Sequence, residues 1–154
     1  MVRRNTEIIF VVFAVLWNIF IWHNSLETSV ESSAQSGVIL DWINSVLANI
    51  GGLELNQFLI RKAAHMFEFF VLAILWNRAF ACCTADTSDI SVKGQYTLPI
   101  LICTVVACID EMIQLHVPGR SGEVRDVLVD ISGALLGIAL IYIINRLRKR
   151  KIYN

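Results

Sequence analysis

Charged residues are scarce in this chain. Only 17% of its 154 residues are Asp, Glu, Lys or Arg, while 56% are hydrophobic. An ordinary soluble domain has about a quarter of its residues charged. The composition therefore excludes an ordinary soluble domain and predicts a protein of the lipid bilayer.

Several further features are missing. The cysteines, Cys82, Cys83, Cys103 and Cys108, lie at the end of an apolar run or inside one. Their positions give no disulfide framework, and their spacing is not that of a zinc site. There is no internal repeat, Gly/Ser-rich linker or low-complexity segment, so we expect residues 1–154 to form a single domain.

Long apolar runs take the place of these features. A hydrocarbon core about 30 Å thick needs roughly 20 mainly apolar residues in a helix. Four stretches qualify, at about 7–23, 61–82, 96–115 and 127–144. The predicted fold class is thus an all-α membrane protein, a bundle of four transmembrane helices.

The first apolar stretch also resembles a secretory signal, because Arg3 and Arg4 precede it. Its length, its content of Phe and Trp, and the lack of a close small-residue cleavage site favour a retained membrane helix instead.

Basic residues mark the predicted orientation. Arg3 and Arg4 precede the first span, and five basic residues crowd 146–151. Basic flanks favour the cytoplasmic side, and both flanks satisfy this rule only if the number of crossings is even. Four spans place both termini in the cytoplasm, residues 25–60 and 116–126 outside, and 84–95 inside.

The first outer loop carries apolar residues at near-helical spacing in 38–50, including Trp42. This pattern predicts a short helix at the membrane surface with Trp42 as an interfacial anchor. A packed cap over the bundle explains the pattern equally well.

Polar residues gather at the predicted outer ends of three spans. Ionisable groups within a span are energetically costly, so they usually face the bundle interior and serve a function. On the second span, Arg61, His65 and Glu68 stack on one helical face, with Lys62 close by.

The third and fourth spans add two more polar groups. Asp110 and Gln114 share a face, with Glu111 turned by about 100°. Asp126 and Asp130 head a stripe that continues through Gly133 and Gly137, where small residues let a neighbouring helix approach. Between these spans, Pro118 and Gly119 favour a turn that directs Arg120 back over the helix ends.

The segments RKAAHMFEF, DEMIQLHVPGR and RDVLVDISGALLG resemble the VanZ-like family of bacterial membrane proteins over about 8–144. The family's patterns fall on Lys62, His65 and Glu68, on Asp110, Glu111 and Gln114, on Pro118, Gly119 and Arg120, and on Asp126, Gly133 and Gly137. Asp130 stands where the family also has Asn. The resemblance implies a multi-pass protein of the bacterial plasma membrane, and one member is associated with low-level resistance to the glycopeptide teicoplanin.

The leading functional hypothesis is a polar pocket at the outer leaflet that binds or acts on a lipid-linked or glycopeptide-related ligand. As an acid/base hydrolase or transferase, the protein would use His65, Glu68, Asp110, Glu111 and Asp126 as catalytic groups. Arg61, Lys62, Gln114, Arg120 and Asp130 would bind the ligand.

Several alternatives stay open at the level of sequence. A divalent metal could be held by His65, Glu68, Asp110, Glu111 or Asp126. The same groups could form a non-catalytic binding or shielding pocket, or a proton-coupled transport site. Charge pairing at helix ends could explain any single residue. The basic C-terminus follows the positive-inside rule, so we expect membrane lipids rather than nucleic acid as partners.

Overall fold

All regular secondary structure in the described part of the chain is helical. The computed structural model describes residues 2–49, 52, 54–83 and 93–153, with side chains described for 8–49, 52, 54–81 and 93–148. Five helices follow one another in these residues: α1 (Val2–Ser25), α2 (Ser29–Asn49), α3 (Gln57–Cys83), α4 (Gly94–Gln114) and α5 (Val124–Tyr153). The predicted inner connection, 84–95, falls almost wholly outside the described residues.

Side chains that bond to the backbone fix the starts of α2 and α3. At α2, the Glu31 backbone N–H donates to Thr28 Oγ1, and Glu31 Oε2 accepts from the Thr28 N–H at 2.9 Å. This reciprocal pattern is a capping box. The hydrogen bonds from Thr28 hold the pKa of Glu31 below its usual value. At α3, Asn56 Oδ1 accepts from the Leu59 N–H at 2.9 Å.

Three of the described helices are long and apolar enough to cross a membrane: Ile8–Ser25, Gly94–Gln114 and Val124–Arg148. Helix α3 is not among them. It corresponds to the predicted span 61–82 and carries Arg61, Lys62, Glu68 and Arg78 among its 27 residues. The prediction of four spans is thus confirmed for three helices.

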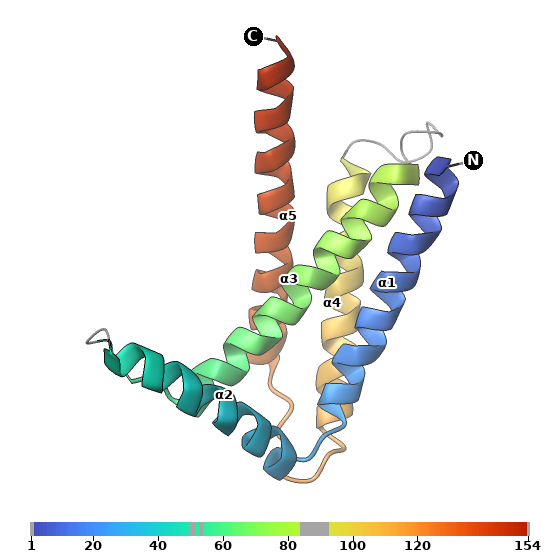
Figure 1. Cartoon of the computed structure of the whole chain (residues 1–154). Helices are drawn as coiled ribbons and strands as arrows, with labels where there is room; N and C mark the ends of the chain where they lie inside the picture. The colour runs from blue at the N-terminus through green and yellow to red at the C-terminus, as the bar shows by residue number, and fades with distance from the viewer. Residues whose placement is uncertain (1, 50–51, 53, 84–92, 154) are drawn as a thin grey trace.

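Helices α1, α3, α4 and α5 run along one another, and both chain termini lie at the same end of the molecule (Figure 1). The connections from α1 to α2 and from α4 to α5 lie at the opposite end, which we call the polar end. The core consists of Ile21, Phe69, Leu72, Ala73, Cys103, Val106, Ala107, Ala134 and Ile138.

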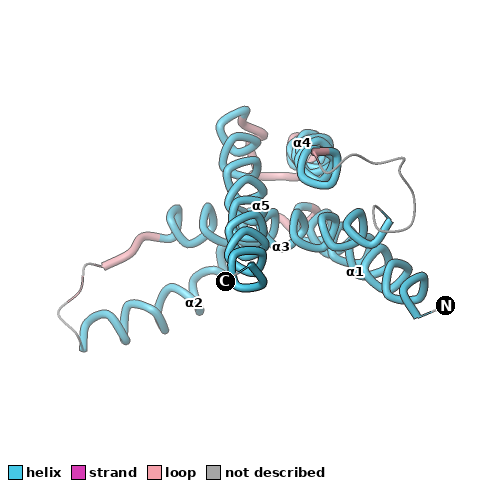
Figure 2. The backbone as a smooth tube through the Cα atoms, turned by 90° about the horizontal axis from the view of Figure 1, so that it is seen from above, coloured by secondary structure: helices cyan, strands magenta, loops and turns pink. Residues whose placement is uncertain are grey.

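Helix α2 projects sideways from the polar end and, among the described helices, packs mainly against α3 (Figures 1 and 2). The Asn44 side chain bonds to both the N–H and the carbonyl of Leu55. Val38 and Trp42 remain exposed. A helix between the first two predicted spans is confirmed and is longer than expected, while its outer location and its place at the membrane surface stay predictions.

Two glycines bring α5 directly onto the backbone of α3. A Cβ atom added at Gly133 would collide with the backbone carbonyl of Met66, and one at Gly137 would lie 2.6 Å from the Phe70 carbonyl oxygen. Backbone atoms cannot turn aside as a flexible side chain can. The glycine face considered above for helix packing is therefore occupied within the chain.

We expect Gly133→Ala to lower the free energy of unfolding by about 1–3 kcal/mol, since α5 must move away from α3 to make room. Gly37→Ala is the matched control, because no atom lies within 4 Å of its added Cβ and the residue lies within a helix. The control should be neutral or gain up to about 1 kcal/mol from helix propensity. Thermal unfolding in detergent, followed by tryptophan fluorescence, measures both. Equal stability of the two variants would contradict the close approach.

Candidate functional site

The three predicted polar groups meet at the polar end. Helix α3 supplies residues from its first half, α4 from its last turns and α5 from its first turns. The end of α1 adds Asn24 and Ser25, which the sequence did not single out. The polar groups at this end therefore come from α1, α3, α4, α5 and the loop between α4 and α5.

Asp110 is fully buried, and neighbouring side chains hold both of its carboxylate oxygens. Ser25 Oγ donates to Oδ1 at 2.6 Å, and Gln114 Nε2 donates to Oδ2 at 3.0 Å. Gln114 follows Asp110 by one helical turn, as its spacing predicted. These contacts fix the orientation of the carboxylate.

Glu68 joins α3 to α1. Its Oε1 accepts from Asn24 Nδ2 at 2.8 Å, and its backbone carbonyl accepts from Trp17 Nε1 at 2.9 Å. His65 lies one turn earlier, with Nδ1 3.8 Å from Glu68 Oε2. This imidazole and carboxylate therefore lie close together, beyond direct hydrogen-bond distance.

Two other acidic residues have local partners. Asp126 forms an ion pair with Lys62, which ties the start of α5 to α3. Glu111 is nearly buried, and its Oε2 accepts from the Glu123 backbone N–H at 2.8 Å. Both carboxylates therefore anchor the α4–α5 connection and the helix that follows it.

The loop between α4 and α5 turns at Gly119, whose φ of 78° lies in the left-handed region that favours glycine. Arg120 then reaches back to α1, where Nη2 donates to the Asn24 carbonyl oxygen at 3.1 Å. The predicted turn and the predicted direction of Arg120 are both present. Burial, followed by the nearby charge of Arg61, lowers the pKa of the Arg120 guanidinium.

Two cavities flank His65. The first has a volume of about 110 Å³ and is lined by residues of α1, α2, α3 and the α4–α5 loop. The second, of about 190 Å³, lies between α3 and the start of α5. Both are lined by Arg61 and His65. The site is thus accessible from two sides.

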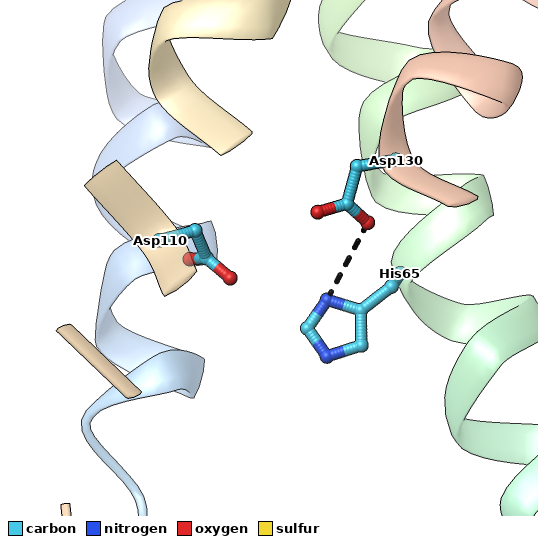
Figure 3. Close-up of side chains that lie close together, drawn as sticks. All are labelled: His65, Asp110 and Asp130. Atoms are coloured by element: carbon cyan, nitrogen blue, oxygen red, sulfur yellow. Dashed lines mark ion pairs between the residues drawn. The ribbon is translucent and has the colours of Figure 1, made fainter. Parts of the chain in front are cut away.

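Asp130 differs from the other acidic residues of the polar end. It is 1% exposed, and neither of its oxygens accepts a hydrogen bond from any described residue. Its Oδ1 lies 3.9 Å from His65 Nδ1, and Figure 3 shows both side chains directed toward Asp110. Single atoms of these three residues lie within 4.8 Å of one another.

The family model described as VanZ/LLP1 matches residues 10–145. The chain belongs to the VanZ/LLP1 family. Together with three helices able to cross a bilayer, this membership makes it a VanZ-like membrane protein. Searches of curated proteins and of solved structures gave no significant match.

Sequence reasoning missed the contribution of α1 to this VanZ-like site. Asn24 and Ser25 close an apolar run, so their local pattern indicates only the end of a helix. It also missed Ser32, Gln35 and Ser36 of α2, which line the first cavity. These residues lie in the polar first half of α2, so no pattern in the sequence separates them from their neighbours.

We expect Ser25→Ala to destabilise this VanZ/LLP1 protein by about 1–3 kcal/mol, because the buried Asp110 carboxylate loses a hydrogen-bond donor. Ser45→Ala is the control, since Ser45 is exposed and its side chain bonds only to the Trp42 carbonyl among described residues. Chemical unfolding in mixed micelles would give both free energies. A loss at Ser25 no larger than that at Ser45 would show that Asp110 does not depend on this contact.

Proposed function

We propose that the first cavity binds the anionic head group of a lipid-linked molecule of the bacterial envelope. The observation that carries the proposal is a pair of guanidinium groups, Arg61 and Arg120, that line one cavity. Neither forms an ion pair with a carboxylate of the described residues. Guanidinium groups bind phosphate and carboxylate through paired hydrogen bonds.

The carboxylates that line the same cavity have neutral partners. Glu27 accepts from Gln35 Nε2 at 2.8 Å, and Glu68 accepts from Asn24 Nδ2 at 2.8 Å. The Nε atom of Arg120 is buried and has no hydrogen-bond partner among the described residues. Arg61 and Arg120 therefore keep donors available for an anion.

The size of the cavity favours a head group over an antibiotic. A volume of about 110 Å³ has room for several water molecules, each of which needs roughly 10–15 Å³ of such space. A phosphate or similar group fits this space, whereas a whole glycopeptide does not. An effect on teicoplanin would then arise indirectly, through an envelope lipid that the protein holds.

Chemistry on the bound group is a second candidate function. It is favoured by the 3.8 Å separation of His65 Nδ1 and Glu68 Oε2, both residues lining the same cavity. An imidazole and a carboxylate so placed could move a proton during hydrolysis or group transfer. The other residues that line this cavity would bind the group without taking part in the proton transfer.

The proposed topology places the polar end and its cavities outside the cell and both termini in the cytoplasm, with α3 as the fourth span. Arg61, Lys62 and Glu68 of α3 would face the site and not lipid. Arg78 lies near the opposite end of this helix. Helix α2 would lie in the outer interface, with Trp42 toward the bilayer.

We expect Arg120→Gln to weaken binding of short-chain phosphatidic acid about 10- to 100-fold, as loss of a charge-assisted hydrogen bond would do. Arg125→Gln is the control, because Arg125 is exposed and does not line the cavity. Titration of protein in phosphatidylcholine nanodiscs measures binding, and thermal unfolding checks folding. Unchanged affinity in a folded Arg120 variant would reject the proposal. A product released from the lipid would identify an enzyme.

Cysteine labelling in whole cells tests the topology in a variant without the four native cysteines. Cysteines introduced at Gly37 and Ser121 should react with a membrane-impermeant maleimide, while one at Arg148 should react only after lysis. Ser121 is a better probe position than the neighbouring Gly122, because an added Cβ at Gly122 would lie 2.8 Å from the Glu111 carbonyl oxygen. Protection of Gly37 and Ser121 in intact cells would invert the orientation.

A further inference from the structure

His65, Asp110 and Asp130 form a cluster at the polar end, and the negative charge of Asp130 in this cluster is not balanced by a hydrogen-bond donor among the described residues. Asp130 is 1% exposed, and both of its carboxylate oxygens lack a hydrogen-bond donor among the described residues. A buried carboxylate without donors costs several kcal/mol unless a cation or a proton compensates it. The nearest lysine identified at the site, Lys62, is engaged by Asp126.

The surroundings of Asp130 match the chemistry of a metal ligand set. His65 from α3 and Asp110 from α4 point into the same space as Asp130 from α5 (Figure 3). One imidazole nitrogen and two carboxylate oxygens are common ligands of Zn²⁺ and Mn²⁺. Three helices thus each contribute one ligand, as in metal sites built inside helix bundles.

The distances also permit coordination. The three ligand atoms lie within 4.8 Å of one another, and His65 Nδ1 lies 3.9 Å from Asp130 Oδ1. A tetrahedral ion with bonds of about 2.1 Å holds its ligand atoms about 3.4 Å apart. Small side-chain rotations can close the difference, since no described donor fixes Asp130 in place.

Partners around the cluster would orient one of its ligands. Ser25 and Gln114 each donate to one oxygen of Asp110, which still has acceptor capacity because a carboxylate has about four lone-pair sites. Such contacts commonly hold metal ligands in position. His65 lines both cavities, so it is the member of the cluster that an entering ion would meet first.

We propose that His65, Asp110 and Asp130 form a binding site for a divalent cation of the Zn²⁺ or Mn²⁺ type. Three protein ligands leave a coordination position open, as in catalytic metal sites. Glu68 lies beside His65 and could approach that position. Glu111 and Asp126, which the sequence also offered as ligands, serve the local contacts described above. The proposal does not depend on the identity of a lipid ligand.

Metal uptake tests the site without any lipid or activity assay. Tag-free protein, stripped with chelator, is dialysed separately against Zn²⁺, Mn²⁺ and Mg²⁺, and bound metal is measured by mass spectrometry. We expect about one Zn²⁺ or Mn²⁺ per chain, weak uptake of Mg²⁺, and a higher unfolding temperature when the ion is bound. Asp130→Asn and His65→Gln should each reduce affinity at least tenfold.

The controls are Asp41→Asn and His116→Gln, which make the same changes at exposed positions. Helical circular dichroism and a monodisperse elution profile check each variant for folding. If Asp130→Asn fails to fold, the partly exposed His65→Gln variant decides the result. No uptake by the unaltered chain, or equal uptake by site and control variants, overturns the metal site. Phosphatidic acid binding in metal-free protein would leave the proposed function intact in that case.

Discussion

The close contact between α3 and α5 is the constraint on which the polar end depends. Gly133 and Gly137 allow backbone to approach backbone. Helices α3 and α5 both run away from the polar end and cross at an angle, so their facing residues near the crossing advance in the same direction. Toward the polar end, the same register brings Asp130 beside His65 and Asp126 to Lys62. A bulky residue in the glycine stripe would separate all of these pairs at once.

The polar residues divide into those with partners and those without. Asp110, Glu68 and Glu111 accept hydrogen bonds from neutral groups, and these contacts join α4 to α1, α3 to α1, and α4 to the loop after it. Asp130 and the Arg120 Nε atom lack such partners among the described residues. Structural groups of a membrane protein are normally satisfied, because an unmet polar group in an apolar medium is costly. Asn18, Trp22 and Trp76 also have a buried polar atom without a partner among the described residues, but only Asp130 and Arg120 in that set are ionisable. These two groups at the polar end are therefore the ones that point to a ligand.

Helical periodicity explains how much could be predicted from the sequence. The spacing of His65 and Glu68, or of Asp110 and Gln114, specifies one face of one helix. Counting apolar runs then placed the three groups at one end, and the structure agrees. Periodicity holds no information on which faces meet, so it could not separate Asp130 from Asp126. Nor could it find Ser25, whose role depends on a contact 85 residues away along the chain.

Positive and negative side chains are separated at the polar end, with arginines at the first cavity and carboxylates in the cluster. Arg61 and Arg120 line the first cavity, while Asp110 and Asp130 lie deeper in the bundle, with His65 bordering both regions. An anion in the cavity would screen the two arginines from each other, and a cation in the cluster would do the same for the carboxylates. Each bound charge would also attract the other across His65, because charges interact strongly where water is scarce. Occupation of one site should therefore raise affinity at the other, and by linkage the effect must be reciprocal.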